Sequence, residues 1–250
     1  METYTYKKVW DELSSYDKTG WRQVLRHLPW VEVNGNSPCL VDTILPHELT
    51  AFYQFGVYTG KSIIVALDAI KSTGKEIDIA YGFDSFEGLP KRTNQERDEV
   101  IQKHGEYLWK AGDYSSDDLY NVKDSREFLQ AVYDQHFHTK VKLIRGWYED
   151  TLNQEAVKKY NLKKAAYIDV DVDTYASCVE VLDFIFSEGI AVRGTIIGFD
   201  DWGGTPNWEE MGEGVSKAFA EAINKYSLNV DVICRVGNAY PQVQAVFLIK

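Results

Sequence analysis

Short apolar runs alternate with longer amphipathic stretches from about residue 48 onward, and this alternation restricts the possible folds more than any other feature. Apolar runs of about four to eight residues are typical of buried strands, whereas longer stretches with a period of about 3.6 residues are typical of helices. We expect strands near 49–55, 77–83, 141–145, 165–172, 194–199, 230–236 and 243–249. We expect helices near 61–72, 124–137, 152–161, 175–188 and 209–226.

The order of these runs predicts a doubly wound α/β fold. Strands that alternate with helices form a mostly parallel sheet with helices on both faces. Only the segment GNAYPQ, residues 237–242, separates the last two expected strands, and it is too short for a helical crossover. We therefore expect these two strands to form an antiparallel hairpin, which leaves one reversed strand at or near the sheet edge.

Two segments do not show this alternation of expected strands and helices. Residues 1–45 are polar, aromatic and weakly periodic, and we expect helical or irregular structure there that acts as a lid or a dimer contact. Residues 88–124 carry many charges of both signs after the second expected strand. An insertion at the carboxyl edge of a parallel sheet lies where ligands bind in such folds. We expect 88–124 to cover an active site in a domain of residues 46–250; a surface loop containing a helix is the alternative.

Composition limits the partners and the compartment. The 250 residues include 27 Lys and Arg against 38 Asp and Glu, a net charge of −11, which argues against nucleic acid or an anionic membrane as partner. The widely spaced Cys39, Cys178 and Cys234 fit a reducing compartment better than a disulfide framework. The N-terminus lacks a secretory pattern, and no run approaches the roughly 18 apolar residues of a membrane helix. We expect a cytoplasmic protein whose aromatic N-terminal segment favours homo-oligomers.

A glycine-containing turn follows the first expected strand. Gly56 and Gly60 lie in the sequence QFGVYTGKS at 54–62, where they let the backbone and the helix N–H groups approach a ligand. The spacing matches neither the nicotinamide fingerprint nor the phosphate-binding loop. Asp84 ends the second expected strand, where an acid accepts hydrogen bonds from ribose hydroxyls. The two strand ends predict a site for an adenosine-type ligand, and a turn cap is the alternative role of Asp84.

Acidic residues gather at the ends of two later strands. Asp169, Asp171 and Asp173 alternate along the fourth expected strand and thus share one face, and Asp200 and Asp201 end the fifth. Like charges at a buried strand end repel unless a cation neutralises them. Carboxylate oxygens suit Mg²⁺ or Mn²⁺, so the pattern predicts a metal site. The alternative is capping, by Asp173 of the next helix and by Asp201 of a turn.

These motifs resemble the macrocin O-methyltransferase (TylF-like) family of S-adenosylmethionine-dependent sugar methyltransferases. The resemblance implies a class I methyltransferase (Rossmann-like) fold, a methyl donor at the first two strand ends, and a divalent cation at the acids. The matching segments, in family order, are FGVYTGKS at 55–62, GFDSFEGLP at 82–90, GWYEDTL at 146–152, DVDTYAS at 171–177, FDDW at 199–202 and EGVSKAF at 213–219.

Residue by residue, the resemblance implies that Asp171, Asp200 and Asp201 bind the metal and that Asp171 is also the catalytic base. Two departures matter. The family usually has Glu where this chain has Gln54, near the expected methionine amino group, and the extra Asp169 makes the register of the acidic motif ambiguous by two residues. The residues expected to bind the donor are Gln54, Gly56, Val57, Tyr58, Gly60, Ser62, Asp84, Ser85, Gly146, Trp147 and Asp169.

The sequence as a whole predicts an O-methyltransferase that uses S-adenosylmethionine and Mg²⁺ to methylate a hydroxyl of a sugar or a glycosylated natural product. Two alternatives stay open. A metal-dependent glycosyltransferase also uses an acid pair such as Asp171 and Asp173 to hold a metal–nucleotide-sugar. A donor-binding module without catalysis is the other alternative, and Gln54 is the feature that supports it.

Overall fold

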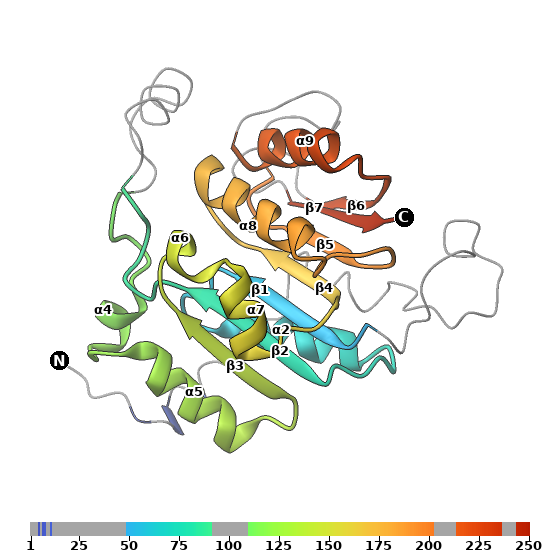
Figure 1. The fold of residues 1–250 in the computed structure, drawn as a ribbon. Coiled ribbons are helices and arrows are strands. Elements are labelled where there is room, and N and C mark those ends of the chain that lie inside the picture. The colour runs from blue at the N-terminus through green and yellow to red at the C-terminus, as the bar shows by residue number, and fades with distance from the viewer. Residues whose placement is uncertain are drawn as a thin grey trace.

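The computed structural model describes residues 5, 7, 8, 11, 49–91, 110–202, 214–236 and 244–250. Its strands form one seven-stranded sheet in the order β3-β2-β1-β4-β5-β7-β6 (Figure 1). The strands are β1 (Ala51–Phe55), β2 (Ile79–Asp84), β3 (Lys140–Arg145), β4 (Ala165–Val170), β5 (Ile196–Phe199), β6 (Val230–Val236) and β7 (Gln244–Ile249). The helices are α2 (Lys61–Lys71), α4 (Ser116–Tyr120), α5 (Ser125–His136), α6 (Tyr148–Thr151), α7 (Gln154–Tyr160), α8 (Tyr175–Ser187) and α9 (Gly214–Tyr226).

The sheet confirms the predicted doubly wound topology and its reversed strand. The pairs β1–β2, β1–β4, β2–β3 and β4–β5 are parallel, whereas β7 runs antiparallel to both β5 and β6. One predicted boundary was wrong, because β4 ends at Val170 rather than at residue 172. Asp171 and Asp173 therefore lie in the connection to α8, and the three acids do not share one strand face.

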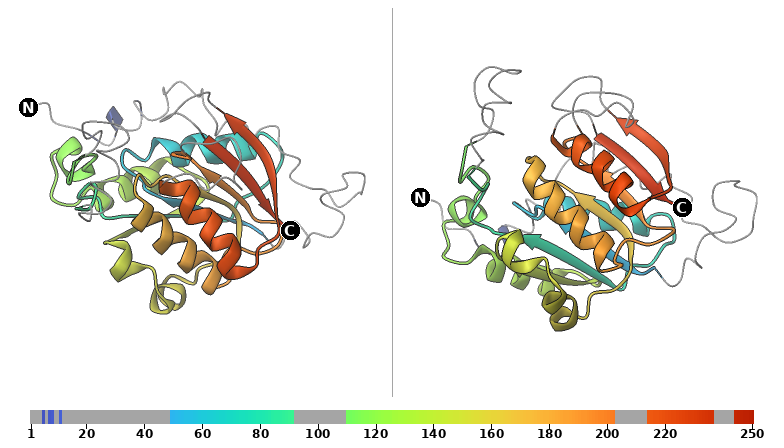
Figure 2. Two further views of the ribbon diagram at one scale, coloured as in Figure 1. Left: turned by 90° about the horizontal axis from the view of Figure 1, so that it is seen from above. Right: turned by 45° about the horizontal axis from the view of Figure 1, so that its top comes forward.

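Helices cover both faces of the sheet, and Figure 2 shows α2 on the opposite side from α8 and α9. Two clusters of buried side chains fill the layers. One joins the sheet to α8 and α9, and the other joins it to α2, α4 and α5. None of the helices in the described part of the chain has the length and apolar content that a membrane span requires.

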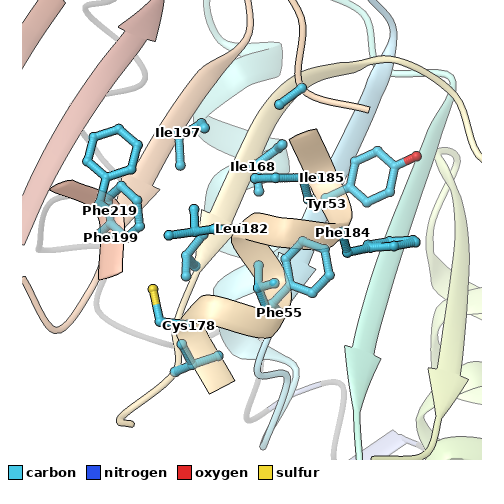
Figure 3. Close-up of a cluster of buried hydrophobic side chains, with 14 of the residues drawn as sticks. Tyr53, Phe55, Ile168, Cys178, Leu182, Phe184, Ile185, Ile197, Phe199 and Phe219 are labelled. Carbon is cyan, nitrogen blue, oxygen red and sulfur yellow. The ribbon is translucent and has the colours of Figure 1, made fainter. Parts of the chain in front are cut away.

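The central strand β1 is buried on both faces and sends alternate side chains into the two clusters. Tyr53 and Phe55 pack in the cluster that includes Phe184 of α8 (Figure 3). On the other face, Phe52 stacks on Tyr167 with ring centroids 5.8 Å apart. Because β1 is enclosed in this way, the loop that follows it starts from a fixed point at the carboxyl edge of the sheet.

Several predictions fall outside the described residues. The predicted lid or dimer contact at 1–45 is described only at residues 5, 7, 8 and 11, and 92–109 of the predicted cover is not described. The start of the predicted helix at 209–226 also lies outside, since α9 is described from Gly214. Cys178 is a buried core residue as expected, whereas Cys39 and the side chain of Cys234 lie outside the described residues.

Candidate active site

The connection from β1 to α2, residues 56–60, is called the glycine loop below. Gly56 and Gly60 both have positive φ, +88° and +78°. A Cβ atom on Gly56 would lie 1.9 Å from the carbonyl oxygen of Asp171, and one on Gly60 would lie 2.2 Å from the hydroxyl of Tyr133. Glycine is therefore required at both positions, for its backbone conformation and for the close approach of two other segments.

Asp84 holds the glycine loop against the end of β2. Its Oδ2 accepts hydrogen bonds from the N–H groups of Val57 (2.6 Å) and Tyr58 (3.0 Å), and its Oδ1 accepts one from Phe86 N–H (2.6 Å). Burial raises the pKa of Asp84, while these N–H donors and nearby Arg145 act in the opposite direction. Asp84 therefore caps a turn, which is the alternative role that the sequence left open. Carboxylate oxygens have further lone pairs, so ribose binding by Asp84 stays a prediction.

Asp171, Asp200 and Asp201 come together just beyond β4 and β5. One carboxylate oxygen from each lies within 4.8 Å of the others. Main-chain bonds set this arrangement, since Asp171 N–H donates to the Phe55 carbonyl (2.9 Å) and Asp200 N–H donates to the Val170 carbonyl (3.1 Å). A set of three half-buried carboxylates that supplies only oxygen atoms suits a hard dication such as Mg²⁺.

The other two acids lie elsewhere. Asp169 is fully buried within β4, where it is the register partner of Gln54 in β1. Asp173 lines the cavity described next, but the N-cap of α8 is Thr174, whose Oγ1 accepts from Ser177 N–H at 3.1 Å. The alternative role of Asp173 as the helix cap was therefore wrong.

A cavity of about 710 Å³ lies along this edge of the sheet, within the usual range of about 300–1,000 Å³ for ligand pockets. It brings together the glycine loop, the end of β2, the turn after β3 and the acid cluster. The predicted site residues that line it are Gly56, Tyr58, Asp84, Ser85, Gly146, Trp147, Asp171, Asp200 and Asp201. Those not among its lining residues are Gln54, Val57, Gly60, Ser62 and Asp169.

Sequence reasoning missed Tyr148 and Glu180, which also line the cavity. The Tyr148 ring meets Phe55 edge-on, with centroids 6.2 Å apart. Burial raises the pKa of the Tyr148 hydroxyl well above its usual value, and the carboxylates of Asp84, Asp171 and Glu180 add to this. Tyr148 therefore stays protonated and able to donate. Its place directly after Trp147 in the motif GWYEDTL was a signal that could have identified it.

Tyr58 and Tyr114 form an aromatic pair on the cavity wall, with ring centroids 5.3 Å apart at 78°. Both have positive φ, 43° and 62°, a conformation that is strained for aromatic residues. Tyr114 belongs to the described part of the predicted cover and is 42% exposed. Burial raises the pKa of its hydroxyl, as do Asp173 and Asp201. Tyr114 thus lines the same cavity as the acid cluster.

Comparisons with known proteins identify the family and the fold. The family model for macrocin-O-methyltransferase (TylF) matches residues 40–234, which is more than half of the chain. The calicheamicin methyltransferase CalS11 is similar in structure, with a TM-score of 0.55 and 16% identity over 97% of this chain and 77% of that chain. The O-methyltransferase NovP has a TM-score of 0.58 and 15% identity over 91% of this chain and 78% of its own.

At 16% and 15% identity, the two structural similarities show a shared fold alone. The family match, in contrast, is a match of the amino-acid sequence. A search of curated proteins returned no match. The family match decides between the two enzyme classes that the acid pair left open, and it excludes the glycosyltransferase. The chain belongs to the macrocin-O-methyltransferase (TylF) family of S-adenosylmethionine-dependent O-methyltransferases.

Proposed function

We propose that the protein methylates a hydroxyl group of a sugar or a glycosylated natural product, assisted by Mg²⁺ bound to Asp171, Asp200 and Asp201. Family membership supports methyl transfer from S-adenosylmethionine to oxygen. The observation that carries the proposal is the convergence of these three carboxylates beside the cavity that the glycine loop also lines. A natural-product acceptor is in keeping with the similarity to CalS11, a calicheamicin methyltransferase.

In this proposal the donor occupies the end of the cavity nearest the glycine loop. Gly56 lines this end of the cavity, and Asp84 and Ser85 face the ribose from the end of β2. The turn at Gly146 and Trp147 forms the adjoining wall. Gly146 N–H donates to the Asp84 carbonyl at 2.9 Å, which joins this turn to the ribose side of the site.

The transfer forms an O–CH₃ bond while the S–CH₃ bond breaks, and the acceptor hydroxyl loses its proton. Such an in-line displacement depends chiefly on how the two reactants are positioned. Asp171 lies where the donor and the acceptor meet, because its carbonyl abuts Gly56 and its carboxylate belongs to the acid cluster. We assign proton acceptance to the Asp171 carboxylate. Bound Mg²⁺ supplies Lewis acidity, which lowers the pKa of a nearby hydroxyl group.

We place the acceptor ring against Tyr58 and Tyr114. Aromatic side chains with a polar tip offer both an apolar face and a hydroxyl, which suits a sugar ring. Tyr114 is close to Asp173 and Asp201, so a ring held there would point a hydroxyl at the acid cluster. Residues 88–124 would then form the cover of the acceptor site, and residues 1–45 a lid or dimer contact.

The test is turnover of S-adenosylmethionine with a panel of free sugars, nucleotide sugars and glycosylated natural products, read by mass spectrometry and NMR. We expect an O-methylated sugar, with activity lost in EDTA and restored by Mg²⁺. Asp200→Asn should abolish the restoration. The matched control is Asp183→Asn, the same change at an acid of α8 that pairs with Lys225 at 2.7 Å. Turnover that EDTA does not affect would overturn the assignment of a metal. Methylation of non-sugar acceptors alone would overturn the assignment of a sugar as the acceptor.

A further inference from the structure

Three consecutive carbonyl groups of the glycine loop accept hydrogen bonds from three hydroxyl groups of one distant segment. The donors come from α4, which lies within the predicted cover at 88–124, and from α5, which follows it in the chain. The pairs are Ser116 Oγ to Tyr58 O (2.8 Å), Tyr120 hydroxyl to Thr59 O (2.9 Å) and Tyr133 hydroxyl to Gly60 O (2.8 Å). We call these three donors the hydroxyl clamp.

The clamp side chains are buried, so their hydroxyl groups are held in place. Ser116, Tyr120 and Tyr133 are 0%, 5% and 1% exposed. The Tyr120 ring packs on Phe128 and the Tyr133 ring on Phe137, with centroids 5.4 and 5.9 Å apart. A hydrogen bond shielded from water is electrostatically stronger than an exposed one.

The first part of the glycine loop is held by hydrogen bonds from Gln54 of β1 and from within the loop. Gln54 Nε2 donates to Gly56 O at 2.9 Å and to Ser62 Oγ at 2.6 Å, and Gly60 N–H donates to Val57 O at 2.8 Å. Together with the clamp, these bonds engage every carbonyl from residue 56 to residue 60. The loop therefore has a hydrogen-bonded frame on the side of its carbonyl groups.

The clamp segment is itself anchored to the end of β3. The Arg145 guanidinium pairs with Asp117 of α4 at 2.7 Å and with Glu87 at 3.1 Å, and it lies 3.6 Å from Asp124, the N-cap of α5. Asp117 Oδ1 also accepts from the Ser125 hydroxyl at 2.6 Å. These contacts fix α4 and α5 relative to the sheet edge, and with them the three hydroxyl groups.

We propose that Ser116, Tyr120 and Tyr133 are positioning residues for the methyl donor, which hold the glycine loop in the shape that binds S-adenosylmethionine. They are not among the residues that line the cavity, so they act through the loop backbone. A loop that is already ordered loses less conformational entropy when the ligand binds. This role requires donor binding alone and is independent of Mg²⁺ and of the acceptor.

The experiment measures the affinity for S-adenosylhomocysteine by calorimetry in Tyr120→Phe and Tyr133→Phe. Each change removes one hydroxyl and keeps the ring in the core. We expect each Kd to rise at least threefold and at most about tenfold, because the loss of one hydrogen bond can weaken the ordering of the loop by no more than that bond's contribution to stability. The KM for S-adenosylmethionine should rise by a similar factor, while kcat at saturating donor stays within about twofold. Ser116→Ala tests the third bond without altering an aromatic core residue.

The matched control is Tyr81→Phe. The Tyr81 ring is 1% exposed, and its hydroxyl donates to the main-chain carbonyl of Asn161 at 2.9 Å, at the end of α7. This variant should lose thermal stability to a similar extent and keep the wild-type Kd. The proposal is overturned if the clamp variants bind S-adenosylhomocysteine within twofold of wild type, or if Tyr81→Phe weakens binding equally.

Discussion

Gln54 is fully buried, and its two amide atoms have different surroundings. Nε2 donates to Gly56 O and Ser62 Oγ, whereas Oε1 has no hydrogen-bond partner among the described residues. A carboxylate cannot donate to the Gly56 carbonyl, so this frame requires the amide. The departure from the Glu usual in the family thus has a structural consequence, and it need not signal a protein without catalysis.

The variant Gln54→Glu should therefore be less stable than wild type, and increasingly so as the pH rises. Burial beside Gly56 O and next to Asp169 raises the pKa of the new carboxyl above its unfolded value of about 4.3. Stability is then retained below about pH 4 and lost as the pH rises through the folded pKa. Urea unfolding between about pH 4 and pH 8 measures this.

Gln154→Glu is the control for that experiment, because Gln154 is exposed at the start of α7. It should be at least as stable as wild type at every pH, because the new carboxylate begins α7 and faces Lys158, whose Nζ contacts Gln154 at 3.3 Å. A Gln54→Glu protein whose free energy of unfolding does not fall with rising pH would contradict the role given to the amide.

Gly56→Ala separates backbone strain from steric conflict. A Cβ at this position meets the Asp171 carbonyl oxygen at 1.9 Å, so β1 and the Asp171 connection must move apart. We expect at least a tenfold loss in affinity for S-adenosylhomocysteine and for Mn²⁺, measured by calorimetry. Gly189→Ala is the control, since Gly189 also has positive φ (+63°) but open space around its Cβ position.

Both alanine variants bear the left-handed backbone cost of about 1–2 kcal/mol. Only Gly56→Ala should lose its ligands. Equal binding by the two variants would show that the contact between Gly56 and Asp171 does not shape the site.

The anchoring of α4 and α5 by Arg145 makes a prediction about pH. Burial alone would raise the pKa of Asp117, but hydrogen bonds from Arg145 and Ser125 hold it below its usual value. A depressed folded pKa stabilises the protein above the unfolded pKa of about 3.9, and this stabilisation is lost as the pH falls through the folded value. Asp117→Asn should thus cost about 1–2 kcal/mol at pH 7 and progressively less toward about pH 3.

Denaturant unfolding of Asp117→Asn and of the control Asp183→Asn measures how much free energy of unfolding each variant loses. The exposed pair of Asp183 with Lys225 should contribute little, about 0–1 kcal/mol. If the two variants lose the same stability at pH 7, Arg145 does not anchor the clamp segment in the way described.

The long elements were predictable from the sequence because burial imposes a clear period on them. All seven strands, the helices α2, α5, α7 and α8, and the described part of α9 appear where the alternation placed them. The end of β4 was misplaced because apolar alternation continues to Val172, although the chain turns away after Val170. The four-residue α6 and the five-residue α4 are too short to show a helical period. No helix was expected at α6, whereas α4 lies in 88–124, where a loop containing a helix was the alternative to a cover.

The site as a whole was only partly predictable. Strand ends identified the glycine loop, Asp84 and the acids, because parallel strands carry their ligands at the carboxyl edge. The strand pattern alone could not select three of the five acids, since that choice depends on β4 lying between β1 and β5, and only the family resemblance pointed to Asp171, Asp200 and Asp201. The hydroxyl clamp was not foreseen because its donors and acceptors are 58, 61 and 73 residues apart and meet only through tertiary packing.

Ligand binding should stabilise the entire fold, because the sites require the folded chain. S-adenosylhomocysteine at about 100 times its Kd should raise the free energy of unfolding by about 2.7 kcal/mol. Mg²⁺ should add a further increase in wild type but not in Asp200→Asn, which keeps the response to S-adenosylhomocysteine. Thermal unfolding with each ligand separately checks both increments, and an equal Mg²⁺ response in the variant would contradict the ligand assignment.

The proposed function depends most on a cation held by Asp171, Asp200 and Asp201. A crystal grown with S-adenosylhomocysteine and Mn²⁺, and measured at a wavelength where manganese scatters anomalously, tests this most directly. We predict one strong anomalous peak bonded to carboxylate oxygens of all three residues at about 2.0–2.3 Å. A peak elsewhere, or none at these residues while S-adenosylhomocysteine fills the cavity, would contradict it.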